Sequence, residues 1–202
     1  MDSKKLFEEV KGLADGLSLM ILVTGIWTAI AGAALDNWAS RLPGFILLIL
    51  IIFFISYYIK FYKVTKLFEA AQPAEETPEE KKKNKWFIII FISEGVLIFL
   101  AINVLVNIKL TQFFIPCMAL IVGLHFYPLG VIFKRSIHYF VGTWMTLVAI
   151  AGIVLTANGF IHQNYITAFT GYGCAAGTSA MGLYMVYYGN KHSRTLLELN
   201  KI

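Results

Sequence analysis

The fold is decided by residues 86–133, which read WFIIIFISEGVLIFLAINVLVNIKLTQFFIPCMALIVGLHFYPLGVIF. Two long apolar runs, Trp86–Ile108 and Gln112–Phe133, stand on either side of a short polar break. Each run has the ~20 residues that a helix needs to cross a ~30 Å hydrocarbon core. Backbone amides have no water partner in that core, so continuous runs of this length are expected to be helical. The stretch predicts a hairpin of two membrane-spanning helices.

Four further runs of similar length extend this pattern along the chain. They are Gly16–Leu35, Gly44–Lys63, Tyr139–Ala157 and Tyr165–Gly189. The 202 residues are 58% hydrophobic and only 14% charged, whereas an average soluble domain has roughly 25% charged residues. The composition therefore excludes an ordinary soluble protein. It predicts one all-α polytopic domain, residues 1–202, with six transmembrane helices in three hairpins and the lipid bilayer as its partner.

The basic residues predict how these helices are oriented. With both termini and the second and fourth loops in the cytoplasm, fifteen of the seventeen Lys and Arg residues lie inside. Only Arg41 and Lys109 remain outside, in agreement with the positive-inside rule. The sequence thus predicts a multi-pass protein of the cell (inner) membrane with both termini cytoplasmic. Because the lysines mark the loops, the pI of about 9.1 reflects orientation and does not indicate a nucleic-acid partner.

Two charged segments are expected outside the bilayer. Residues 1–15 carry apolar side chains at helical spacing among lysines and glutamates, as in a helix that lies on the membrane surface. An extension of the first membrane-spanning helix explains the same pattern equally well, and both interpretations stay open. Residues 69–85 are first acidic and then basic and contain two prolines, which predicts a mobile charged cytoplasmic loop.

Glu94 and His125 are the residues most able to carry chemistry. Glu94 lies about 12 Å into its run and His125 about 13.5 Å into the next, counted from the same side at 1.5 Å per residue. An ionised carboxylate at this depth costs several kcal/mol, so Glu94 is expected to be protonated, to pair with His125 or to face water. One interpretation is a pair that handles a proton, a small cation or a small solute. An equally weighted alternative is a neutral hydrogen-bonded pair that locks the hairpin.

Three further residues of this hairpin are candidates. Pro128 lies inside the run and cannot donate a hydrogen bond to the Leu124 carbonyl, which predicts a kink or gate beside His125. Asn103 and Asn107 lie on the other side of the first helix and are expected to make polar contacts with a neighbouring helix.

Small residues predict where the helices pack closely. Gly25, Ala29 and Gly32 form one such face, and Gly173 and Gly177 form another. Close approach through small residues promotes association in lipid, where no hydrophobic effect acts between helices. Packing within one bundle is favoured over a homo-oligomer interface.

The remaining residues indicate little further chemistry. The chain has no phosphate-binding loop, nucleophile elbow or clustered metal ligands, so we expect no catalytic residues, no cofactor and no metal. His138, His162 and His192 are expected at solvated surfaces, and Cys117 and Cys174 are expected to be inert buried thiols. A small carrier or sensor is the favoured function. An interaction or assembly subunit is the alternative, and a lipid-modifying membrane enzyme comes third.

The sequence around His125 also resembles a known group of proteins. Gly123-Leu124-His125-Phe126-Tyr127-Pro128-Leu129, followed by Lys134-Arg135, resembles a Gly-Leu-His-Phe-x-Pro-Leu element of bacterial six-helix membrane proteins of unknown function. The resemblance implies six helices and marks His125 and Pro128 as family features. It implies no activity.

Overall fold

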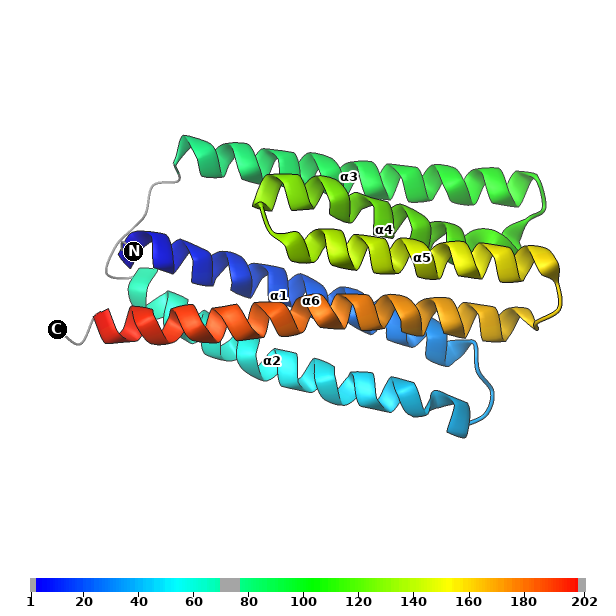
Figure 1. Ribbon diagram of the computed structural model, residues 1–202, viewed down its shortest axis with the longest axis horizontal. Coiled ribbons are helices and arrows are strands. Elements are labelled where there is room, and N and C mark those ends of the chain that lie inside the picture. Colours follow the sequence, from blue (N-terminus) through cyan, green and yellow to red (C-terminus); the bar gives the residue numbers. More distant parts are fainter. Residues whose placement is uncertain (1–2, 70–76, 200–202) are drawn as a thin grey trace.

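The chain folds into long, nearly parallel and antiparallel helices (Figure 1). The computed structural model describes residues 3–69 and 77–199, and in these residues every regular element is helical. The elements are α1 (Ser3–Ala33), η1 (Ala39–Arg41), α2 (Leu42–Glu69), α3 (Pro78–Asn107), η2 (Thr111–Phe113), α4 (Phe114–Phe133), α5 (Ser136–Asn158) and α6 (Gln163–Leu199). The all-α prediction is confirmed.

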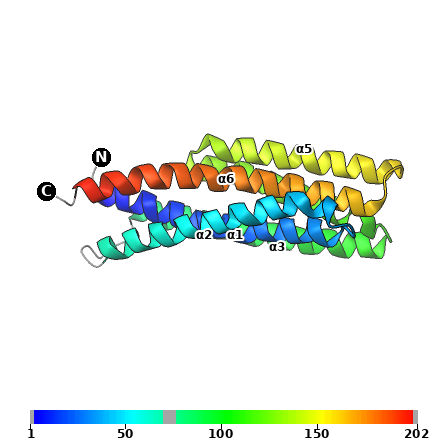
Figure 2. The same ribbon diagram turned by 90° about the horizontal axis from the view of Figure 1, so that it is seen from below.

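The last helix occupies the centre of the bundle. α6 contacts α1, α2, α4 and α5, whereas α3 lies at the edge and packs mainly on α4 (Figures 1 and 2). Consecutive helices of each expected hairpin do contact each other, but the most extensive contacts join α1 to α6 and α4 to α5. The two ends of the chain are therefore packed side by side, which three separate hairpins would not provide.

Five helices are long and apolar enough to cross a membrane in the part of the chain that the structure describes. They are α1 to α5, and α6, the expected sixth transmembrane helix, does not meet this criterion. Instead, α6 buries many Gly, Ala, Thr and Ser residues against its neighbours. A helix enclosed by other helices needs less apolar surface than one that faces lipid.

Helix α1 is continuous from Ser3 into the first apolar run. Leu6 and Phe7 are buried and form a small cluster with Val64 of α2 and Leu196 of α6. Residues 3–15 thus continue the first apolar helix, as in the alternative of a helix extension, and their apolar side chains pack on α2 and α6. Protein side chains, rather than lipid, cover the apolar face.

The expected loop at 69–85 is shorter than predicted. Glu69 still belongs to α2, and α3 begins at Pro78, so residues 78–85 are helical. Proline is well tolerated in the first turn of a helix, where its missing N–H has no intrahelical partner. Residues 70–76 lie outside the described part of the chain.

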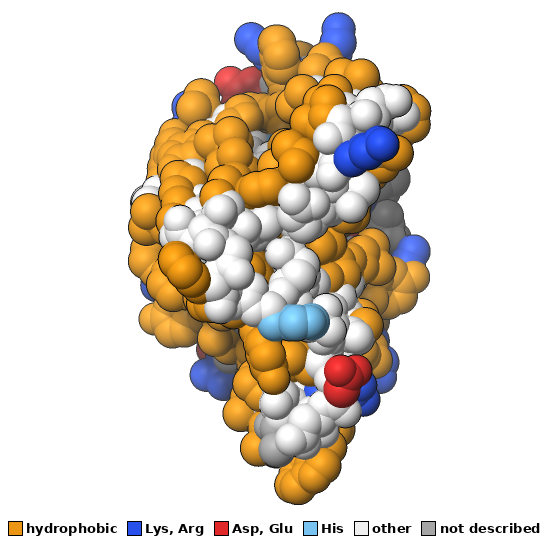
Figure 3. Space-filling model, turned by 90° about the vertical axis from the view of Figure 1, so that its right-hand side faces the viewer, with side chains coloured by type: hydrophobic (Ala, Val, Ile, Leu, Met, Phe, Trp, Pro, Cys, Tyr) orange, Lys and Arg blue, Asp and Glu red, His pale blue; other side chains and the backbone are white. Residues whose placement is uncertain are grey.

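Both termini lie at one end of the bundle (Figure 1). The last turn of α2, the first turn of α3 and the turn at Lys134 and Arg135 are on this same side, and the α1–α2, α3–α4 and α5–α6 connections are at the opposite end. The opposite end shows mostly hydrophobic side chains with a few scattered charged ones (Figure 3). The chain thus separates most of its basic residues from this second end.

A buried hydrogen bond joins the two central helices. The hydroxyls of Thr24 on α1 and Thr178 on α6 are 2.7 Å apart, and both residues are fully buried. The Thr178 hydroxyl also lies 3.1 Å from the Ala175 carbonyl oxygen of its own helix. This contact is one that the small-residue pattern did not predict.

Candidate functional site

The structure brings Glu94 and His125 together. Glu94 Oε2 on α3 lies 3.5 Å from His125 Nδ1 on α4. The side chains are only 13% and 15% exposed, respectively. Two residues that stand 31 positions apart in the sequence thus form an acid–imidazole contact within the apolar part of the bundle.

The position of Glu94 follows from the single face that α3 packs on α4. Partly buried residues of α3 recur at helical spacing on this face, and they are Phe87, Ile90, Glu94, Ile98, Ala101, Ile102 and Leu105. The rest of the helix is largely exposed, as expected for a helix at the edge of the bundle. Glu94 stands in the middle of this face and must therefore point toward α4.

The turn between the helices sets their register. Lys109 adopts a left-handed backbone conformation with φ 58°, and the Leu110 amide donates to the Leu105 carbonyl at 2.8 Å. These features close the end of α3 and reverse the chain within a few residues. As a result, side chains at equal depth on either side of the turn lie opposite each other.

His125 does not lock the hairpin through a hydrogen bond to Glu94. Its Nδ1 lies 2.5 Å from the Val122 carbonyl oxygen of its own helix, so Nδ1 carries a hydrogen and donates it there. The 3.5 Å separation from Glu94 is longer than the 2.7–3.2 Å that is typical of direct N–H···O bonds. The carboxyl group is a second, looser neighbour of the same ring nitrogen.

A second histidine, His138 in the first turn of α5, is also buried near this pair. The sequence-based expectation that it lies at a solvated surface is wrong. It is only 4% exposed, its Nδ1 lies 3.3 Å from the Arg135 carbonyl, and its ring stacks on Phe133 with 5.7 Å between centroids. Phe126 lies between the two histidines, with its ring centroid 4.5 Å from that of His125 and 6.4 Å from that of His138. A row of rings therefore runs from the pair toward the turn at the end that carries the termini.

A sequence signal for His138 was present. The buried residues of α5 recur at helical spacing and begin with it, in the order His138, Val141, Gly142, Met145, Val148, Ala149 and Gly152. This pattern was not used because the adjacent basic residues Lys134 and Arg135 indicate a solvent-exposed turn, and His138 was assigned to the same surface.

Pro128 lies inside α4, which continues from Phe114 to Phe133. Its side chain is exposed, as is that of Leu124 one turn earlier. The proline therefore faces away from the bundle, and its role as a kink or gate stays a prediction.

The asparagines do not make the expected contacts with another helix. Asn103 Nδ2 donates to the Phe99 carbonyl and Asn107 Nδ2 to the Asn103 carbonyl, both at 2.7 Å. Both side chains are exposed on the outer face of α3. Because no helix covers that face, the amides satisfy themselves on their own backbone.

The two small-residue faces differ. A Cβ atom on Gly173 would lie 2.7 Å from Val148, and one on Gly177 would lie 2.9 Å from Trp144, so α5 fills this face of α6. At these two glycines α5 therefore packs against α6 within the chain itself. Gly171 is as closely packed on the other side of α6, against Ala31 and the Trp27 carbonyl, and sequence analysis missed it.

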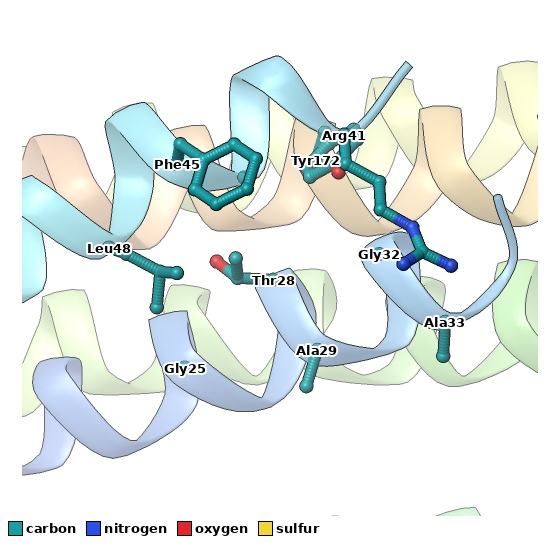
Figure 4. Close-up of a pocket in the computed structure, with 10 residues that line it drawn as sticks. Gly25, Thr28, Ala29, Gly32, Ala33, Arg41, Phe45, Leu48 and Tyr172 are labelled. Atoms are coloured by element: carbon teal, nitrogen blue, oxygen red, sulfur yellow. The ribbon is translucent and has the colours of Figure 1, made fainter. Parts of the chain in front are cut away.

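The other face was wrongly predicted as a packing surface. A Cβ on Gly25 would meet nothing within 4 Å, Ala29 is exposed, and Gly32 has only the Tyr172 hydroxyl at 4.0 Å. These residues instead line a hollow of about 360 Å³ between α1 and α2 (Figure 4). A second hollow of about 190 Å³ lies between α3 and the start of α4. Neither is lined by Glu94 or His125.

The described residues include no group of three or more His, Cys, Asp or Glu side chains placed to hold a metal ion. No protein-family model matches the chain, and comparisons with curated proteins and with solved structures find no match. The functional argument therefore depends on the geometry of the site itself.

Proposed function

We propose that the protein is a small carrier or sensor of the cell (inner) membrane that handles a proton at Glu94 and His125, with both termini cytoplasmic. One observation carries the proposal: a carboxyl group and an imidazole face each other at 3.5 Å inside apolar helices without a direct hydrogen bond that fixes them. A structural lock would be better served by a short bond between the two side chains.

The energetics of the site support a mobile proton. A charged carboxylate at the centre of a transmembrane helix costs about 2.5–3.5 kcal/mol on insertion scales. A protonated Glu94 beside a neutral His125 avoids that cost. Because Nδ1 of His125 already carries a hydrogen, the ring can accept the Glu94 proton only at Nε2, by way of a water molecule or after the ring rotates. The carboxylate and the imidazolium that result form an ion pair in which each charge offsets the other. Histidine is the side chain best suited to such exchange near neutral pH.

The surroundings of the pair favour a proton over a larger solute. The two hollows described above lie elsewhere, so neither of them offers space for a larger solute beside the pair. A proton needs only hydrogen-bonding groups or single water molecules along its route. The pair also retains a little exposed surface, through which such water can reach it.

The direction of release follows from His138. This second buried imidazole lies between the pair and the end that carries the termini. Phenylalanine rings cannot carry a proton, so water or side-chain rotation must connect the histidines past Phe126. We propose that the proton exchanges with the cytoplasm through His138.

Proteoliposomes with an imposed pH gradient test the proposal. The wild type is expected to dissipate the gradient, and Glu94→Gln and His125→Ala are expected to abolish most of this flux. Glu79→Gln is the matched control, since Glu79 is an exposed carboxylate near the start of the same helix. If correctly folded Glu94→Gln protein conducts protons at the rate of the wild type, the proposal is wrong.

A further inference from the structure

The hollow between α1 and α2 has the features of a ligand site. One wall is α1, where Gly25, Ala29 and Gly32 leave an open strip without large side chains. Phe45 and Leu48 of α2 form the opposite wall (Figure 4). The volume of this apolar space, about 360 Å³, is near the lower limit for known ligand pockets, which is about 300 Å³.

A cation stands at one end of this apolar space. Arg41 belongs to η1, in the connection between α1 and α2, and its guanidinium extends toward α1 near Gly32 (Figure 4). Nε and Nη2 lie 2.8 Å and 2.5 Å from the Leu35 carbonyl oxygen and donate to it. A guanidinium has five N–H donors, so others are left for a ligand. Among the described residues, no carboxylate pairs with Arg41.

An unsatisfied hydroxyl lines the same hollow. Tyr172 Oη, from α6, is buried and has no hydrogen-bond partner among the described residues. It lies 3.0 Å from the position of a Cβ on Gly44 and 4.0 Å from that of a Cβ on Gly32. A buried polar group without a partner costs about 1–3 kcal/mol, so a ligand that accepts a hydrogen bond here would recover that loss.

Together these features describe a site for an amphiphile with a negative headgroup. We infer that the hollow binds one anionic phospholipid, with the phosphate on Arg41 and Tyr172 and an acyl chain along the Gly25–Ala29 strip. Arg41 directly precedes α2, where the chain enters its apolar helix, so its charge stands where a lipid headgroup would be. Phosphate oxygens match the guanidinium fork and accept from a hydroxyl. The unpaired charge favours a lipid with net negative charge over a zwitterionic one.

Native mass spectrometry of the full chain in detergent tests this inference. Phosphatidylglycerol and phosphatidylcholine with the same acyl chains are offered, and the wild type is expected to retain phosphatidylglycerol preferentially. Arg41→Gln is expected to weaken this retention at least about tenfold, as loss of a charge-assisted bond implies. Lys109→Gln is the control, because Lys109 is also basic and exposed at this end but does not line the hollow.

A second variant separates binding from any folding defect of Arg41→Gln. Ala29→Trp fills the strip while leaving the Arg41 bonds to Leu35 intact, and it is expected to displace the lipid. Ala176→Trp, at an exposed alanine of α6 outside the hollow, is expected to retain it. Equal retention by Ala29→Trp and Ala176→Trp would overturn the inference. So would protection of the protein against heat by inorganic phosphate but not by phosphatidylglycerol.

Discussion

The carboxyl group of Glu94 has only apolar neighbours on its own face of α3. Ile90 and Ile98, one turn away on either side, offer it no hydrogen bond, and its nearest described polar partner is the His125 ring. That ring in turn donates to the Val122 carbonyl, so the carboxyl group and the imidazole are coupled without being fixed. Coupling of this kind has a measurable free energy.

A double-mutant cycle measures that coupling. Glu94→Gln, His125→Ala and the double variant are unfolded in detergent, and the coupling is expected to be about 0.5–1 kcal/mol, the range of polar contacts between membrane helices. A cycle of Glu94→Gln with a substitution at the exposed His162 is the control. Additive effects at both pairs, within about 0.3 kcal/mol, would mean that the contact is not formed.

For single residues, the sequence predicted how deep a side chain lies along its helix better than it predicted which groups surround that side chain. Counting from the cytoplasmic end of each run placed Glu94 and His125 at nearly one depth, because the rise per residue of a helix is constant. The environment of a side chain depends on which helices surround it, and this differs along the chain. His138 was therefore missed because α4 and α5 enclose it, and Asn103 was misassigned because nothing covers the outer face of α3.

At the scale of helices, glycines have different roles at positions that look alike in the sequence. Gly171 lies against the Trp27 carbonyl and Ala31 of α1, whereas Gly25 faces an open hollow. The sequence pattern could not separate the two, because small residues allow close approach but do not require it. Whether a glycine is closely packed or faces a hollow depends on the position of the neighbouring helix.

Alanine substitutions reveal this difference. Gly171→Ala should lower the thermal stability, since overpacking typically costs about 1–3 kcal/mol. Gly25→Ala should be neutral or stabilising by up to about 1 kcal/mol, because alanine favours the helix and meets nothing within 4 Å. Thermal unfolding in detergent checks both, and an equal loss at the two sites would contradict the packing described here.

The ends of α1 and α6 are held by protein contacts beyond the apolar runs. The sequence segments ended where charged residues begin, but the helices continue because Leu6, Val64 and Leu196 pack together. Apolar composition measures contact with lipid, and it cannot locate a helix end that other helices stabilise.

Leu196 provides a test of these contacts. It is fully buried, whereas its neighbour Leu197 is 37% exposed. Leu196→Ala is expected to cost about 2–4 kcal/mol of unfolding free energy, in the range of buried leucine truncations, and Leu197→Ala well under 1 kcal/mol. Chemical unfolding followed by circular dichroism distinguishes them, and similar values would argue that the ends of the helices are not packed.

At the scale of the whole molecule, a small-residue helix is surrounded by more apolar ones. α6 contacts four of the other five long helices, and its buried Gly, Ala, Thr and Ser residues let them approach. This arrangement explains why a central helix can be the least apolar. It also requires α6 to run the length of the bundle, from the end opposite the termini back to the terminal end (Figure 1).

Site-directed labelling tests this topology. Single cysteines replace Ser136 and Asn164, which are exposed at opposite ends of the bundle, in a chain where Cys117 and Cys174 are changed to alanine. A membrane-impermeant maleimide applied to intact spheroplasts is expected to label position 164, and to label position 136 only after the membrane is opened. Labelling of both positions in intact spheroplasts would contradict the arrangement.

The central claim is that Glu94 exchanges its proton within the membrane, and infrared difference spectroscopy tests it most directly. The protein in lipid bilayers is titrated while the carboxyl C=O band is recorded. We predict a band that changes reversibly with pH, disappears in Glu94→Gln and shifts in His125→Gln, but is unchanged in Glu79→Gln. Two results would contradict the account. One is that no titrating band disappears in Glu94→Gln, and the other is that the band that disappears there does not shift in His125→Gln.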